Sequence, residues 1–170
     1  IIASFVQPVN TIRKITVAVP QRAEYEVGFY RWVERLSRMA SEIGCRIDFH
    51  ATAETGGLIA HYVGTYHKDV RADYKLMDSW DELSALQQSV ADDHLFVAVI
   101  SRPGGISYQK SFKQLHKQMH DHFNRCSLMV VYPDQYGENT EEYTFSEPHR
   151  TQFEQSRTSA WLSKWINKIG

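Results

Sequence analysis

The chain has 170 residues, which is enough for one domain with a sizeable core. Its 19 lysine and arginine residues nearly balance 20 acidic residues, so no overall charge attracts it to nucleic acid or anionic lipid. No apolar run approaches the roughly 18 residues of a membrane helix, and Cys45 and Cys126 have no zinc or redox spacing. We therefore expect a soluble domain in a reducing compartment, without a nucleic-acid partner.

Residues 1–13 have no regular pattern and are interpreted as a linker. Because the chain starts without methionine, we expect it to be part of a longer protein. Residues 14–19 are rich in β-branched side chains and stop at a proline, which predicts a buried strand. Apolar residues then recur every three or four positions over 24–43, and Gly44 follows, which predicts a helix and its end.

Four further elements follow in chain order: a strand at 46–51, a Gly-interrupted helix at 57–66, a weak strand at 73–77 and a helix at 81–91. Residues 94–100 and 127–132 are apolar on both faces, as central parallel strands are when helices cover both sides of a sheet. A helix at 111–123 connects them. Five strands alternating with helices predict an α/β fold with a doubly wound five-stranded parallel sheet over residues 14–134.

Beyond this domain, residues 135–150 are polar and acidic and predict a surface loop. Residues 151–170 return to helical spacing with an apolar stripe that includes Trp161 and Trp165, which predicts an added C-terminal amphipathic helix. The stripe is expected to pack on the domain or on a second subunit; a membrane interface is the other interpretation, with only a thin basic face to support it. This tail and a free edge on the fifth strand favour a homodimer.

Ligands of open parallel sheets bind at the carboxyl ends of the strands, where the strand order reverses. The segment 101–107, SRPGGIS, falls at this rim and offers two glycines followed by a helix N-terminus, which favours an anion. The alternative is that its Pro-Gly-Gly sequence is only a turn, and the rim an empty scaffold. The candidate ligand contacts are Gln21, Arg102, Gly104, Gly105, Ser107 and Ser111, with Arg102 able to pair with a phosphate or carboxylate.

Several catalytic patterns are absent from the sequence. It has no GxSxG elbow, no Walker loop and no GxGxxG motif, so we expect no enzyme and no catalytic residues. His116 and His120 share a helical face close to Asp121 and His122, which raises a metal interpretation. Because no third ligand is evident, a solvated helix surface is favoured and no metal is expected.

The order of elements over residues 14–134 resembles the universal stress protein family, whose layer is related to that of adenine nucleotide hydrolases. That family holds ATP with a G-x2-G-x9-G-[ST] loop and an aspartate after the first strand. The corresponding residues here are Ser101, Gly104, Gln114 and Leu115 in the loop, and Pro20 after the strand. The resemblance therefore implies the fold and a nucleotide rim, but without the usual grip on ATP.

A closer resemblance is to the stress-protein-like cytosolic domains of bacterial sodium/proton antiporters. The phrases DDHLFVAVISRPGGISYQ and SLMVVYPDQYG carry it. It implies a non-catalytic regulatory or sensory domain on the cytoplasmic face of the bacterial inner membrane, whose partner is the transmembrane antiporter domain of the same chain. A nucleotide or other small anion is a candidate ligand, and no cofactor is assigned. The alternatives are a free-standing universal stress protein that binds ATP and a hydrolase of the related adenine-nucleotide class.

Overall fold

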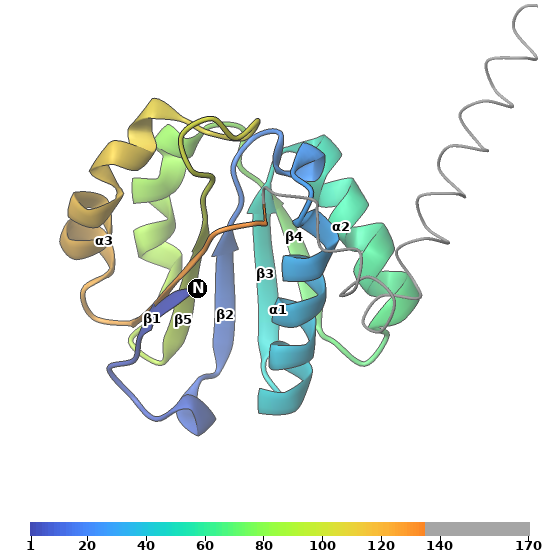
Figure 1. Ribbon diagram of the computed structural model, residues 1–170. Helices are drawn as coiled ribbons and strands as arrows, with labels where there is room; N and C mark the ends of the chain where they lie inside the picture. Colours follow the sequence, from blue (N-terminus) through green and yellow to red (C-terminus); the bar gives the residue numbers. More distant parts are fainter. Residues whose placement is uncertain (135–170) are drawn as a thin grey trace, which may run out of the picture. The chain divides into compact units, whose positions relative to one another are not determined.

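The structure, a computed structural model, describes residues 1–134. Its centre is a six-stranded sheet in the order β1-β6-β5-β2-β3-β4 (Figure 1). Strands β2 to β6 pair with one another in parallel, and β1 pairs with β6 in the antiparallel direction. The strands are β1 (Ile2–Ser4), β2 (Lys14–Ala18), β3 (Arg46–Ala51), β4 (Ala72–Leu76), β5 (His94–Val99) and β6 (Ser127–Val131).

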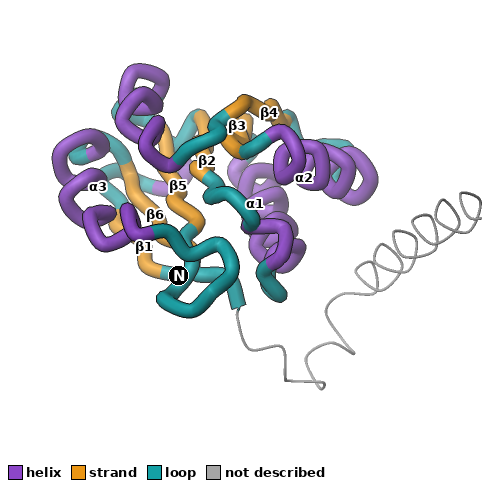
Figure 2. Tube along the Cα trace, turned by 90° about the horizontal axis from the view of Figure 1, so that it is seen from above, coloured by secondary structure: helices purple, strands orange, loops and turns teal. Residues whose placement is uncertain are grey.

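Helices cover the two faces of this sheet (Figure 2). On one face, Trp32 of α1 packs 6.5 Å from the ring of Phe49 on β3. On the other, Phe123 of α3 stacks on Phe96 of β5 with ring centroids 3.9 Å apart. The helical elements are η1 (Val9–Thr11), η2 (Ala23–Tyr25), α1 (Phe29–Ile43), α2 (Ala53–Tyr66), η3 (Trp80–Ser89), η4 (Lys110–Gln114) and α3 (Leu115–Phe123).

The expected sheet of five parallel strands is corrected in one respect: the sheet has six strands and is mixed. The sixth is β1, which lies within residues 1–13 and pairs with β6 through the register Ala3↔Met129. Ile2 stays 64% exposed, so β1 is held by backbone hydrogen bonds more than by burial, and no apolar pattern marks it. Because β1 covers β6, the edge that was expected to be free for a second subunit is already paired.

All four helices predicted within residues 1–134 differ in detail. The helix predicted at 24–43 begins at Phe29, because its first residues form the 3-10 turn η2 and an extended Glu26. α2 begins at Ala53, four residues earlier than expected, because the Thr52 side chain caps it by accepting a hydrogen bond from the Thr55 amide at 3.3 Å. The helix predicted at 81–91 is the 3-10 element η3, whose start is fixed by a capping box between Ser79 and Glu82. The helix predicted at 111–123 is divided into the short η4 and α3. The polar loop at 135–150 and the helix at 151–170 lie outside the described residues.

Candidate functional site

The parallel strands form a doubly wound sheet whose order reverses between β2 and β5. Strand β2 pairs with β3 on one side and with β5 on the other, so the connections diverge at this junction. In Figure 1 the two strands lie side by side and end at the same rim. This is the place at which open α/β sheets bind ligands, and it is the place predicted from the sequence. The segments after β2 and β5 therefore form the candidate site.

The segment after β5 forms a tight turn. Gly104 has a φ of +94°, which L side chains rarely adopt, and the Gly105 amide donates to the carbonyl of Arg102 at 3.0 Å. The next element is the five-residue 3-10 helix η4, and α3 begins only at Leu115. The expected helix N-terminus at Ser111 is therefore absent, and with it the source of helical amides for an anion.

A carboxylate of the chain itself occupies this turn. Oε1 of Glu26 accepts hydrogen bonds from the Ser101 hydroxyl at 2.9 Å, the Ser107 amide at 2.9 Å and the Ser107 hydroxyl at 2.7 Å. All three residues are buried, with Glu26 only 6% exposed. These are hydrogen bonds of ordinary length, and together they satisfy a carboxylate oxygen that is removed from water. The rim thus contains a buried glutamate whose carboxylate joins the segment after β2 to the loop after β5.

The backbone between β2 and α1 brings Glu26 to this position. Arg22 has a φ of 64°, unusual for a residue other than glycine, and starts the short η2 turn. Two residues after Glu26, the Gly28 amide donates to the carbonyl of Asp134 at 3.0 Å. Arg31 also pairs with the Asp134 carboxylate at 3.2 Å. We call residues 23–28 the rim segment; it is fixed to the loop after β5 and to the chain just beyond β6.

Glycine is required where the rim segment meets the end of β6. A Cβ atom at Gly28 would lie 2.4 Å from the backbone nitrogen of Asp134. Backbone atoms cannot retreat as a flexible side chain can, so any larger residue would force the two segments apart. This close approach places Glu26 within reach of the serines.

Three other candidate contacts predicted from the sequence have partners other than the Glu26 carboxylate or lie elsewhere on the rim. The Gln21 amide donates to the Asp78 carbonyl, at the start of the connection to η3. The guanidinium of Arg102 is exposed and lies 5.5 Å from the centre of the Tyr132 ring. Ser111 is half-buried in η4. The structure therefore brings Ser107 to the anion, and adds Ser101 and Glu26, which were not among the predicted contacts.

The cysteines have surroundings that suppress thiolate chemistry. Burial raises the pKa of the Cys126 thiol to about 11 and also raises the pKa of Cys45. Because the thiolate is the nucleophile, neither side chain is activated. His116 and His120 are both exposed on α3, and within residues 1–134 no three His, Cys, Asp or Glu side chains are grouped to hold a metal ion.

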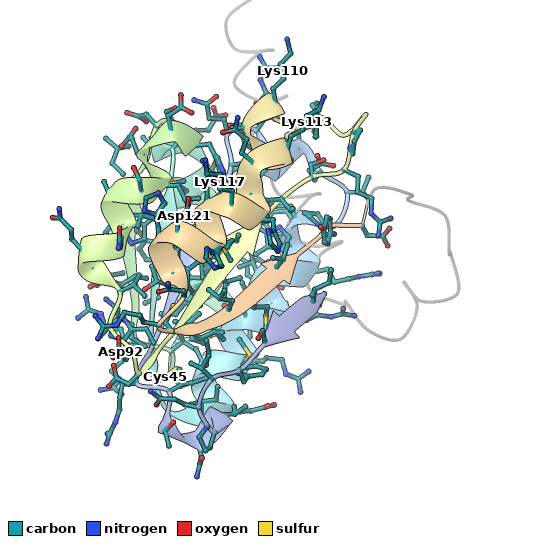
Figure 3. All side chains as sticks on the ribbon, turned by 90° about the vertical axis from the view of Figure 1, so that its left-hand side faces the viewer. Cys45, Asp92, Lys110, Lys113, Lys117 and Asp121 are labelled. Carbon is teal, nitrogen blue, oxygen red and sulfur yellow. The ribbon has the colours of Figure 1, made fainter. Side chains whose placement is uncertain are left out.

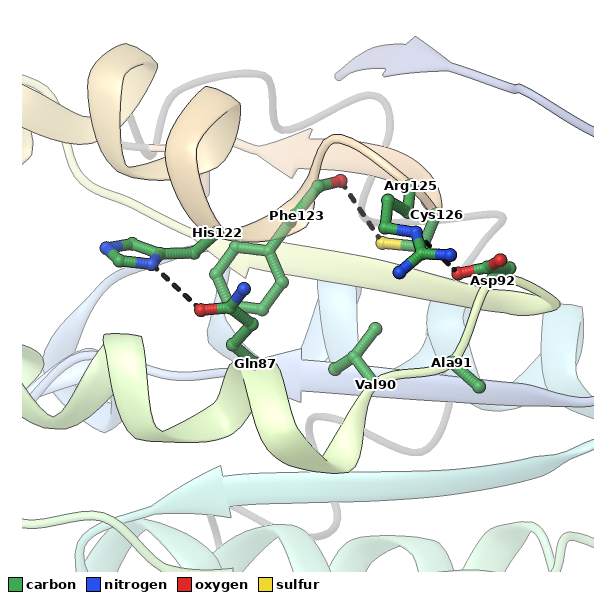
Figure 4. A pocket seen from close by; sticks show the side chains of 8 residues that line it. All are labelled: Gln87, Val90, Ala91, Asp92, His122, Phe123, Arg125 and Cys126. Atoms are coloured by element: carbon green, nitrogen blue, oxygen red, sulfur yellow. Dashed lines mark hydrogen bonds and ion pairs between the residues drawn. The ribbon is translucent and has the colours of Figure 1, made fainter.

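A small cavity lies between the C-terminal parts of η3 and α3 (Figure 4). Its volume is about 120 Å³, below the roughly 300 Å³ at which small-molecule sites begin. The Arg125–Asp92 ion pair and the His122–Gln87 hydrogen bond are at its wall. These residues precede β5 and β6 or end α3, so the cavity is at the opposite end of the strands from the rim.

The outer side of η4 and α3 is basic. Figure 3 shows Lys110, Lys113 and Lys117 following one another along it, and all three are exposed. Asp121 continues the same side and offsets part of the charge. This is a solvated helix face of the kind expected for this segment.

Fold and rim together define a doubly wound α/β domain whose rim contains a buried, hydrogen-bonded glutamate. No family model matches the chain, and no curated protein matches it. Among solved structures, "Crystal structure of universal stress protein in complex with cAMP" is similar with a TM-score of 0.43 and 14% identity, covering 73% of this chain and 98% of that one. Within residues 1–134, no helix has the length and hydropathy needed to cross a bilayer.

Proposed function

We propose that the chain is a non-catalytic regulatory domain, and more specifically the cytosolic domain of a bacterial cation/proton antiporter. The observation that carries the regulatory part is the Glu26 carboxylate seated on Ser101 and Ser107. A triphosphate that approached this turn would meet a buried negative charge and donors that are already used. The rim is therefore less suited to holding and cleaving a nucleotide than to regulation. In such regulation, a ligand would compete with the Glu26 carboxylate, or a partner domain would contact the rim.

The antiporter part is supported by the two sequence phrases given above. They meet at one rim: the first contributes the loop 101–107, and the second contributes Tyr132 and Asp134 at the end of β6. Arg102 lies over the Tyr132 ring, and the rim segment binds Asp134. Arg102 of the first phrase thus lies against Tyr132 of the second, which supports one joint role for the two phrases.

The regulatory mechanism would be differential affinity. A ligand or a partner domain changes transport only if it binds one arrangement of this domain better than another. The contacts between the rim segment, the loop 101–107 and Asp134 are the part whose arrangement such binding would change. The transmembrane unit of the same protein, at the cytoplasmic side, is the proposed partner, and a homodimer is the proposed assembly.

The second candidate is a free-standing protein of the universal stress type that binds ATP. The doubly wound strand order and the glycine turn after β5 favour it. Pro20 in place of the usual acidic residue and Glu26 in the anion position oppose it. Calorimetric titration of ATP into the chain tests the second candidate: micromolar binding supports it, and the absence of binding opposes it.

Transport by the complete gene product tests the antiporter proposal. Ion-driven proton exchange would be followed in everted membrane vesicles containing the full-length protein with Glu26→Ala, with Glu24→Ala as the control. Glu24 belongs to the same segment but hydrogen-bonds Thr55 at 2.6 Å, away from the loop 101–107. We expect only the Glu26 variant to change the ion or pH dependence of exchange. A gene product without transmembrane segments, or equal behaviour of both variants, would refute the proposal.

A further inference from the structure

We propose that Ser101 and Ser107 form a binding site for a small oxyanion, that Glu26 occupies it from within the chain, and that an incoming oxyanion releases the rim segment from the end of β6. The ligand class is inorganic phosphate or a phosphate monoester. The inference deepens the proposed regulatory function and rests on it for its biological use, while the site itself is argued from geometry.

The donors identify the chemistry of the ligand. Two hydroxyls and one amide converge on a single oxygen at 2.7–2.9 Å, so they recognise an anionic oxygen and not a particular side chain. If Glu26 moved away, the buried amide and hydroxyl of Ser107 would lose the acceptor that they share, which is costly unless another anion replaces it. The Ser101 hydroxyl would keep the Arg102 carbonyl, at 3.3 Å, as an acceptor. A phosphate oxygen offers the same acceptor with a greater charge. Exposed Arg102, in the same loop, is available to the remaining charge.

Glu26 is connected through backbone hydrogen bonds to Asp134, just beyond the end of β6. The amide of Phe29, the residue after the rim segment, donates to the Glu26 carbonyl at 3.0 Å, and the Gly28 amide donates to the Asp134 carbonyl at 3.0 Å. Displacing the Glu26 carboxylate therefore acts on the bond between Gly28 and Asp134, the last residue described. Linkage makes the effect reciprocal: whatever draws Asp134 away also weakens the hold of Glu26 on the serines.

Phosphate titration with amide hydrogen exchange on the 170-residue chain tests the proposal. Wild type, Glu26→Ala and Glu24→Ala would be titrated with inorganic phosphate by calorimetry. We expect Glu26→Ala to bind phosphate at least about tenfold more tightly than the other two, because no internal anion competes. Without phosphate, the Ser107 and Gly28 amides of this variant should exchange faster than in wild type. Phosphate should restore the protection of Ser107 but not of Gly28.

An arm with ATP separates the sources of the phosphate group. Tighter binding of ATP than of phosphate to Glu26→Ala assigns the site to a nucleotide, and equal or weaker binding assigns it to a free oxyanion. Glu26→Gln keeps the shape of the side chain without its charge, and we expect its phosphate affinity to lie between those of wild type and Glu26→Ala. It provides the same comparison if the alanine variant does not fold.

The inference is overturned if a folded Glu26 variant binds phosphate no better than wild type, or if saturating phosphate leaves Ser107 unprotected. Glu26 would then have a purely structural role. This result is separable from failure of the proposed function. Phosphate binding with the expected pattern, together with unchanged transport by the full-length variant, would retain the site and reject the regulatory function.

Discussion

The ammonium group of Lys75 on β4 lies 2.8 Å from the carboxylate of Asp48 on β3, which has no exposed surface. Arg46 Nε approaches the same carboxylate to 2.9 Å and Lys14 Nζ to 3.5 Å. Burial alone would raise the pKa of Asp48, but hydrogen bonds from Lys75 and Arg46 and the charges of Lys14 and Lys75 outweigh it and lower the pKa. Cations from three adjacent strands thus hold one buried anion.

Replacing Asp48 by asparagine is expected to lower the free energy of unfolding by about 3 kcal/mol, because the cations lose their buried partner. Asp73→Asn is the matched control: this exposed carboxylate pairs with Arg46, and its loss should cost less than about 1 kcal/mol. The pKa of Asp48 is lowered on folding, so its contribution is present above the unfolded pKa and disappears as pH falls through the folded value. Urea unfolding at neutral and acidic pH measures both effects. Equal costs for the two variants would contradict this account.

His50 on β3 should remain neutral until strongly acidic pH. Burial, then the charge of Lys75, lowers its pKa to about 4, although Asp48 opposes the shift. The unfolded state takes up the proton first, near its ordinary pKa of about 6.5, so the fold loses stability as pH falls from there toward about 4. His50→Gln should flatten this part of the stability curve. An NMR titration of the imidazole with a midpoint near 6.5 would show the explanation to be wrong.

Gly28→Ala is expected to lower the free energy of unfolding by about 2 kcal/mol, since its Cβ would collide with the Asp134 backbone. Gly64→Ala offers the opposite control. It lies within α2, where an added Cβ meets nothing within 4 Å, so alanine should stabilise the protein by about 0.5 to 1 kcal/mol. Thermal unfolding of both variants decides the matter. If Gly28→Ala were neutral, the rim segment would not be held against the end of β6 as described.

The two cysteines should react with a thiol reagent only after unfolding. Both are buried, and burial raises the pKa of Cys126 to about 11, so almost no thiolate forms at neutral pH. Labelling with a disulfide reagent, followed with and without denaturant, measures their accessibility. Rapid labelling of the native protein would contradict the packing around Cys45 and Cys126.

The fold was largely predictable because its core strands carry strong local signals. The strand predicted at 46–51 coincides with β3. The strands predicted at 14–19 and 94–100 begin at the same residues as β2 and β5. β1 was missed because its side chains are exposed and its pairing lies in the backbone, which sequence patterns do not record. The homodimer, the ligand and the tail remain predictions.

The sequence predicted where the candidate site lies, but not the residues that fill it. The position of the rim follows from strand order, and Ser107 was selected from the loop sequence. Glu26 was missed because it was placed in the helix predicted at 24–43, where Glu24 is an equivalent glutamate, and its partners Ser101 and Ser107 are 75 and 81 residues away along the chain. Burial produced by such distant contacts leaves no local pattern, and a glutamate is normally expected at the surface.

The central claim is that the Glu26 carboxylate holds the loop after β5 through Ser107, and a double-mutant cycle tests it most directly. Unfolding free energies would be measured for wild type, Glu26→Ala, Ser107→Ala and the double variant. A hydrogen bond to a buried charge predicts a coupling energy of about 1.5 kcal/mol or more between the two positions. Additive effects, with a coupling indistinguishable from zero, would contradict the account.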